Sequence, residues 1–263
     1  MVIFHERMEL QLNIFSAIGN FLQNGLLFSG IEFSFNPFPL AVFICIVISY
    51  LLGSINSAVL VSRMFYGEDI RTKGSGNAGL TNTMRVYGKH AGIYVLLGDI
   101  LKTVLSILIT ACVFGFQYAY SFALMPVLYL SAAACVIGHA YPVFFRFKGG
   151  KGVLCTAAAA LVLSPLVFLI GIVVFLIILF GTKYVSLASI SVGFFYPILL
   201  NRLSALFGLS HDMLTILCTV FLGLFIIYCH RKNIRRLLDH CENKVSFGKK
   251  NKEQKNDTGD KEA

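Results

Sequence analysis

Residues 166–182 read LVFLIGIVVFLIILFGT, an uncharged run as long as the stretch that carries a helix across a bilayer. Similar runs recur along the chain. Of its residues, 57% are hydrophobic and only 13% are charged, about half the charged share of a soluble domain. One globular core cannot bury that much apolar surface, whereas each crossing of a bilayer takes about 20 apolar residues. The sequence therefore predicts an all-α membrane protein.

Seven apolar segments follow residue 38. They are Pro39–Met64, His90–Phe116, Tyr120–Phe144, Val153–Leu163, Leu166–Thr182, Val185–Leu200 and Met213–Cys229. The fourth is too short to cross a hydrocarbon core of about 30 Å, so we expect a short or re-entrant helix, entered from the glycine-rich stretch before it. Pro165 marks the turn into the next segment. We thus expect about seven transmembrane helices, one of them short or re-entrant.

Basic loops alternate with neutral ones between these segments. The basic residues are Arg63, Arg71, Lys73, Arg85 and Lys89 in the first loop, Arg146, Lys148 and Lys151 in the third, Lys183 in the fifth, and Arg231, Lys232, Arg235 and Arg236 after the last segment. Arg202, expected in the loop that also holds Asp212, is the exception. Because basic loops stay in the cytoplasm, the pattern predicts a cytoplasmic C-terminus and an N-terminus outside.

The chain divides into three parts by composition. Residues 1–38 form an N-terminal extension in which Leu10–Ile31 is apolar but interrupted by Asn and Gln, which favours an interfacial helix over a further span. Residues 39–244 form the transmembrane domain. Residues 245–263 form a charged tail that we expect to be disordered.

The formal net charge of +9 does not indicate a nucleic-acid partner, because the basic residues lie in membrane loops and no basic and aromatic interleaving accompanies them. None of the seven cysteines has C-x-x-C spacing, so neither a zinc site nor a redox pair is indicated.

Three polar patches interrupt the apolar pattern, all on the side predicted to be cytoplasmic. The first, residues 74–85, reads GSGNAGLTNTMR. Its glycines allow backbone N–H groups to converge on an anion, and its arginine is a planar fork that suits phosphate. A flexible loop that caps a helix has the same composition. The candidate binding residues are Gly74, Ser75, Gly76, Asn77, Thr81, Asn82 and Arg85.

The second patch runs from Gly138 to Gly152 and ends in FKGGKG, without the spacing of a Walker A loop. Lysines among glycines at a helix start form an anion cradle, although the same lysines also suit positive-inside anchoring. The candidate residues are Lys148, Gly149, Gly150, Lys151 and Gly152.

The third patch begins at His230, and Asn233 shares its helical face at i+3. A histidine at a membrane surface serves as a base, as a hydrogen-bond donor to phosphate or as an ordinary interfacial residue. Ser186, at the start of the sixth segment, is a further donor on the same side. Asp99 and Lys102, at i and i+3, can pair inside the membrane, as a functional pair or as a structural lock.

Taken together, the patches resemble the bacterial glycerol-3-phosphate acyltransferases that use acyl phosphate. Those enzymes have a glycine-serine run near their first helix, a GHxxPxFxxFKGGKG loop and a late HRxNIxRLLxGxE stretch. The matching positions here are Gly53-Ser54-Ile55, residues 74–85, residues 138–152, and residues 230–238 with Glu242. The likeness in order and spacing extends from about Pro39 to Lys244.

The resemblance implies transfer of a fatty acyl chain from acyl phosphate to the 1-hydroxyl of sn-glycerol 3-phosphate, which gives lysophosphatidic acid and phosphate, the first acylation of phospholipid synthesis. It implies no cofactor and no metal, membrane lipids around a monomer, and an active site on the cytoplasmic face of the bacterial inner membrane. By similarity, Ser75, Arg85, His230 and Asn233 are catalytic, Lys148 and Lys151 belong to the glycerol 3-phosphate site, and Glu242 is structural.

Two other classes are weighed against this one. None of the six histidines has an aspartate five residues on, which argues against an acyl-CoA-dependent enzyme of the His-x4-Asp type. A transporter of phosphate or a small organic anion is the alternative outside the acyltransferases, but its polar residues would lie near the midplane between repeated halves, and no repeat is visible. A non-catalytic scaffold fits poorly with so many motifs.

Overall fold

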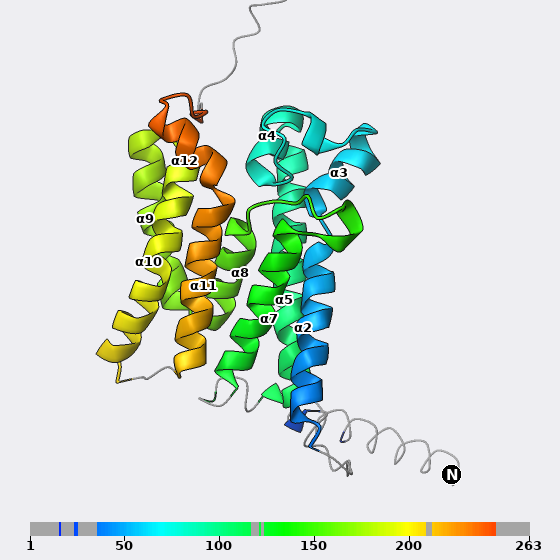
Figure 1. The fold of residues 1–263 in the computed structure, drawn as a ribbon, viewed down its shortest axis with the longest axis vertical. Coiled ribbons are helices and arrows are strands. Elements are labelled where there is room, and N and C mark those ends of the chain that lie inside the picture. Colours follow the sequence, from blue (N-terminus) through cyan, green and yellow to red (C-terminus); the bar gives the residue numbers. More distant parts are fainter. Residues whose placement is uncertain are drawn as a thin grey trace, which may run out of the picture.

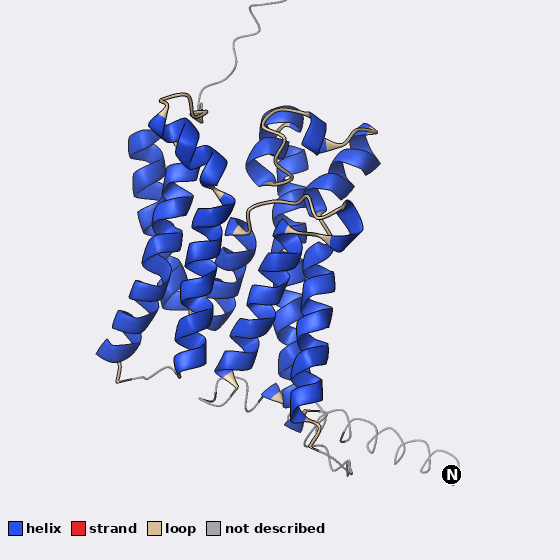
Figure 2. Ribbon diagram, in the orientation of Figure 1, coloured by secondary structure: helices blue, strands red, loops and turns tan. Residues whose placement is uncertain are grey.

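The computed structural model describes residues 36–116, 124–208 and 212–245, with Ser16, Asn24, Gly25 and Ser121. These residues form helices and loops and no strand (Figure 2). The predicted interfacial helix over Leu10–Ile31, apart from the isolated positions just named, and the tail after Val245 lie outside the described residues.

Each of the seven apolar segments contains a helix. The main helices are α2 (Phe38–Ser54), α3 (Ser57–Tyr66), α5 (Lys89–Phe114), α7 (Met125–Ala140), α8 (Val153–Leu163), α9 (Pro165–Thr182), α10 (Val185–Leu206) and α11 (Met213–Cys229). By length and apolar composition, five spans of the described chain can cross a membrane, or six if α11 and the following α12 (Arg231–Leu238) count as one bent span. The short helix α8 is additional. The protein is therefore a multi-pass helical membrane protein.

Several helix boundaries differ from the sequence-based expectation. The first segment is broken at Ile55–Asn56, where the Asn56 side chain accepts a hydrogen bond from the Val59 backbone N–H (3.0 Å) and caps α3. Helix α7 ends at Ala140, because Tyr141 precedes a proline and takes a non-helical conformation. Helix α10 contains Pro197 and continues past Leu200 to Leu206, so Arg202 lies on a helix and not in the predicted loop.

The bundle has one end where most of the polar loops gather, here called the loop end (Figure 1). It carries the segment between α3 and α5, with the short helix α4 (Leu80–Tyr87), the α7–α8 loop, the α9–α10 turn and α12. Helix α8 begins part-way down the bundle from this end, so the α7–α8 loop leads into the interior (Figure 1). The short fourth segment thus follows a polar loop that enters the bundle, as the sequence predicted.

Glycines allow α2 and α7 to pack closely. A Cβ on Gly53 would overlap the backbone of Cys135, and a Cβ on Gly138 would overlap the carbonyl oxygen of Tyr50. Small residues at such contacts let helix backbones approach inside a membrane. The core between α7, α8, α10 and α11 lies beneath the loop end and includes Tyr129, Cys155 and Leu222. This packed core supports the polar loops above it.

Candidate active site

The first polar patch folds around one buried amide. The Asn82 side chain accepts from the Ser75 N–H (2.8 Å) and donates to the carbonyls of Lys73 (3.0 Å) and Ile70 (3.3 Å). Gly74 and Gly76 have φ of 57° and 73°, which glycine adopts without strain. The oxygen and both N–H groups of the Asn82 amide are therefore bonded within the loop, so Asn82 shapes the site. No N–H of its side chain is left for the predicted role as a donor to substrate.

The second patch is tied back to the end of α7. The N–H groups of Gly149 and Gly150 donate to the carbonyls of Ala140 and His139, both at 3.1 Å. A Cβ on Gly150 would overlap the His139 ring, which explains the glycine there. Because these two N–H groups are already bonded, the anion-binding capacity of the loop rests on its lysines and on the start of α8.

The third patch is organised by Glu242. Its carboxylate accepts from Ser186 (2.9 Å), Asn233 (2.6 Å) and Arg236 (2.6 Å). Partial burial would raise the pKa of Glu242, but these donors hold it below the ordinary value. Lys151 donates to Asn233 (2.7 Å), which joins the second patch to α12. The carboxylate is thus ionised and joins the start of α10 to α12.

His230 is buried at the junction of α11 and α12, and its Nδ1 lies 2.8 Å from the Ile226 carbonyl oxygen. A carbonyl only accepts, so Nδ1 carries the hydrogen, and in the neutral ring Nε2 is left as an acceptor. His230 and Asn233 both border the same cavity, as their i and i+3 spacing predicted. No carboxylate within the described chain bonds to the His230 ring.

A cavity of about 520 Å³ joins the three patches to the apolar interior. Its polar end is lined by Ser75, Asn77, Thr81, Asn82, Arg85, Lys151, Gly152, Ser186, His230, Asn233, Arg236 and Glu242. Its other end runs between α8, α9 and α10 and is lined by Leu154, Ala157, Leu161, Phe168, Ile172, Phe175 and Val192. The shape and chemistry suit a molecule with a polar head and an apolar chain.

A second cavity of about 270 Å³ is more polar and opens beside the first. Its lining includes Gly76, Lys148, Gly149, Gly150, Arg231 and Lys232. The two cavities share Ser75, Asn77, Lys151, Asn233 and Arg236. Every site residue predicted from the sequence therefore lines one cavity or both, except Gly74, which lines neither and serves the turn before Ser75.

Among the cavity-lining residues that were not singled out as site residues from the sequence are Arg236, His139 and Thr156. Arg236 follows Asn233 by three residues, and that i+3 spacing would have placed it on the same face. His139 lies inside the second motif. Thr156, one turn into α8, has a buried hydroxyl without a hydrogen-bond partner in the described chain, and nothing in the sequence pattern marks it.

The predicted Asp99–Lys102 pair forms, with 2.8 Å between Oδ1 and Nζ, and lies beneath the larger cavity. Lys102 also contacts His139 Nδ1 (2.9 Å), and the Ser57 hydroxyl donates to Asp99 (2.9 Å). The ligand atoms of Asp99, His139 and Cys155 lie within 4.8 Å of one another, a spacing that can hold a metal ion. The Lys102 ammonium already contacts two of these groups, so a further cation fits poorly and we assign none.

Three cations that line the cavities have no internal partner. Within the described residues, Arg85 and the ammonium groups of Lys148 and Lys232 make no ion pair and no side-chain hydrogen bond. Burial lowers the pKa of Lys151 to about 8; Glu242 opposes this shift, while Arg236 and Arg85 favour it. The site therefore presents unpaired positive charge and neutral donors around the region where the cavities meet, which is what a pair of phosphate-bearing substrates requires.

Comparison with known proteins agrees with this geometry. A glycerol-3-phosphate acyltransferase of Bacillus cytotoxicus is 39% identical over 212 residues, which cover 80% of this chain and 98% of that protein. One of Mycoplasmopsis synoviae is 38% identical over 215 residues, with 77% and 93% covered.

Solved structures show the same likeness. The crystal structure of PlsY (YgiH), an integral membrane glycerol 3-phosphate acyltransferase, matches in its glycerol 3-phosphate form with a TM-score of 0.69 at 36% identity, over 78% of this chain and 96% of that one. Its lysophosphatidic acid form matches with a TM-score of 0.67 at 34% identity, over the same shares. The family model for glycerol-3-phosphate acyltransferase matches residues 43–240, and the chain belongs to this family of membrane acyltransferases.

Proposed function

We propose that this glycerol-3-phosphate acyltransferase takes its acyl group from acyl phosphate and transfers it to the 1-hydroxyl of sn-glycerol 3-phosphate. The observation that supports the proposal is the pair of joined cavities, one with an apolar end and one that is polar and cationic. Acyl phosphate fits the first, with its chain between α8, α9 and α10. Glycerol 3-phosphate fits the second, near Lys148 and Lys151.

In the reaction, the 1-hydroxyl oxygen bonds to the acyl carbon, and the bond between that carbon and the phosphate oxygen breaks. The hydroxyl proton goes to a phosphate oxygen, and the products are lysophosphatidic acid and inorganic phosphate. Ser75, Arg85 and Lys151 stabilise the negative charge that develops on the phosphate. Because no carboxylate of the described residues bonds to the His230 ring, we assign His230 a role as a polar contact to substrate and leave the proton to the substrate phosphate.

We further propose that the loop end faces the cytoplasm, so that the N-terminal end of α2 lies on the outer side of the bacterial inner membrane, and that the enzyme acts as a monomer. The basic residues of the predicted cytoplasmic loops support the orientation, as does the need for water-soluble glycerol 3-phosphate to reach the site. The clustering of the polar residues at one end also disfavours the anion transporter, whose site would lie near the midplane.

The donor is tested with purified protein supplied with acyl phosphate, acyl-CoA and acyl carrier protein thioester side by side, in buffer with a metal chelator. We expect rapid acylation of glycerol 3-phosphate from acyl phosphate alone, because the cationic end of the larger cavity matches a small anionic leaving group. Equal turnover with acyl-CoA, or a requirement for added divalent metal, would contradict the proposal.

The orientation is tested on a native cysteine. Cys241 follows α12 at the loop end and is the exposed cysteine among the seven. A membrane-impermeant maleimide should label it in inside-out vesicles and leave it unlabelled in right-side-out vesicles. The Cys241→Ser variant identifies the signal, since it should remain unlabelled in both. Ready labelling of the native protein in right-side-out vesicles would overturn the topology.

Arg85 is predicted to bind phosphate through two parallel hydrogen bonds from its guanidinium. Lysine keeps the charge and loses this geometry, so Arg85→Lys should reduce kcat/KM by roughly one to two powers of ten, the equivalent of ~1.5–3 kcal/mol for a hydrogen bond to a charged group. Arg85→Ala should lose more, with unchanged yield of inserted protein. If Arg85 only anchors topology, the lysine variant will turn over normally, and that result would remove Arg85 from the site.

Lys151 predicts a pH dependence. Its ammonium is present below a pKa of about 8 and is lost as the pH rises through that value. Phosphate monoesters are already dianionic there, since their second pKa is ~6. We therefore expect kcat/KM for glycerol 3-phosphate to fall as the pH of the assay rises through about 8. In Lys151→Arg, which stays charged, the residual activity should lack this fall. The same fall in both proteins would assign it to another group.

A further inference from the structure

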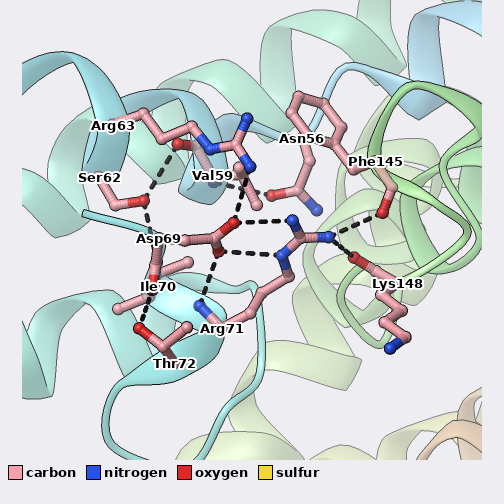
Figure 3. A network of polar contacts seen from close by, with 10 residues as sticks. All are labelled: Asn56, Val59, Ser62, Arg63, Asp69, Ile70, Arg71, Thr72, Phe145 and Lys148. Atoms are coloured by element: carbon pink, nitrogen blue, oxygen red, sulfur yellow. Dashed lines mark hydrogen bonds and ion pairs between the residues drawn. The ribbon is translucent and has the colours of Figure 1, made fainter. Parts of the chain in front are cut away.

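A cluster of charged residues outside both cavities joins the first loop to the second (Figure 3). Asp69 caps the turn before the first glycine-rich stretch. Its carboxylate accepts from the backbone N–H of Arg71 (3.0 Å), from Arg71 Nε (2.9 Å) and Nη2 (2.7 Å), and from Arg63 Nη2 (2.9 Å). Hydrogen bonds from Arg71 hold the pKa of Asp69 well below its usual range, although burial opposes them. The carboxylate is therefore ionised and fixes the Arg71 side chain in one orientation.

The remaining edge of the Arg71 guanidinium reaches the second loop. Its Nη1 donates to the carbonyl oxygens of Phe145 (2.7 Å) and Lys148 (3.1 Å), residues 74 and 77 positions further along the chain. Figure 3 shows the Lys148 side chain extending away from the guanidinium. Arg71 thus holds the backbone of Lys148 while leaving its ammonium free for a ligand in the smaller cavity.

The two carbonyls bracket a strained stretch. Arg146 and Phe147, which lie between them, both have φ of 57°, a left-handed conformation that side chains disfavour. Two consecutive residues of this kind persist only where the surroundings over-determine them. Backbone hydrogen bonds from Phe147 to Pro142 (2.9 Å) and from Lys148 to Phe145 (3.3 Å) hold this turn. Arg71 Nη1 adds to them by bonding the carbonyls on both sides of the two residues, because relaxing either residue would move one carbonyl away from it.

We propose that Arg71 is a positioning residue for glycerol 3-phosphate: it holds residues 145–148 in their strained conformation and so presents Lys148 and the Gly149–Lys151 stretch to the polar cavity. The inference rests on the assignment of that cavity to glycerol 3-phosphate. Arg71 itself lines neither cavity and touches no substrate. Lysine cannot replace it, because the three guanidinium nitrogens donate hydrogen bonds in fixed directions and an ammonium on a flexible side chain does not.

The test separates positioning from general stability. Arg71→Lys should raise the KM for glycerol 3-phosphate roughly tenfold, the equivalent of one hydrogen bond from a charged group, with kcat within about threefold and the KM for acyl phosphate unchanged. Arg63→Gln is the matched control. It removes a cation from the same carboxylate without a hydrogen bond to the second loop, and it should leave both KM values near those of the native protein.

A second substitution tests the strain. Glycine adopts a positive φ freely, so Arg146→Gly in the Arg71→Lys background should lower the KM for glycerol 3-phosphate most of the way back to its native value. Arg146→Ala removes the same charge without favouring that conformation, and it should not recover the KM. If Arg71→Lys does not accumulate in the membrane, Asp69→Asn, which frees the same guanidinium, is assayed with the same pair of second substitutions and the same expectations.

An unchanged KM in the Arg71→Lys variant, an equal rise in the KM for acyl phosphate, or equal rescue by glycine and alanine would each overturn the proposal. These outcomes are distinct from failure of the proposed function, in which the native protein would use acyl-CoA as readily as acyl phosphate or would require a divalent metal.

Discussion

The Glu242 carboxylate is the contact on which the geometry of the site depends. It lies beyond the end of α12, yet it bonds Ser186 at the start of α10 and both Asn233 and Arg236 on α12. Through Asn233 the same network reaches Lys151 at the start of α8. Burial of a carboxylate costs free energy unless the carboxylate is paired and hydrogen-bonded. The donors therefore stabilise the carboxylate, and the carboxylate fixes the donors in turn. Without Glu242, Ser186 and Arg236 would lose their partner in this network, and the Lys151–Asn233 hydrogen bond alone would join α12 to the second loop.

The position of α8 decides how a polar site can exist inside an apolar bundle. Because α8 is short and begins below the loop end, the backbone before it enters the interior without a helix around it. Such backbone is tolerated at membrane depth only where its polar groups are satisfied or line a cavity. Both conditions hold here, since the N–H groups of Gly149 and Gly150 bond to α7 and Lys151 opens onto both cavities. The same shortness leaves room beside α8 for an apolar chain.

Sequence patterns predicted those features that depend on neighbours along one helix. The pairing of Asp99 with Lys102 and the shared face of His230 and Asn233 follow from i and i+3 spacing. The partners from distant elements did not follow. Nothing local to Asp99 indicates Ser57 or His139, and nothing in the glycine-rich stretches shows that Asn82 and the α7 carbonyls would occupy the N–H groups expected to meet an anion. The break at Asn56 was missed for a different reason: its cap on Val59 is local, but apolar residues continue on both sides of it.

Some polar side chains use all their hydrogen-bonding groups within the protein, and these residues build the site. Others keep free donors, and these residues meet substrate. Asn82, Glu242 and Asp69 use their side chains fully within the protein, and each fixes a loop. Arg85 and the Lys148 ammonium, in contrast, have no partner within the described residues, although both line a cavity. A cation whose backbone is held by hydrogen bonds or a helix, and whose charge is unpaired, is available when a phosphate arrives, so binding and charge development require little reorganisation of the backbone. This pre-organisation explains why so many residues of the three motifs bond to each other: they hold the few free donors in place.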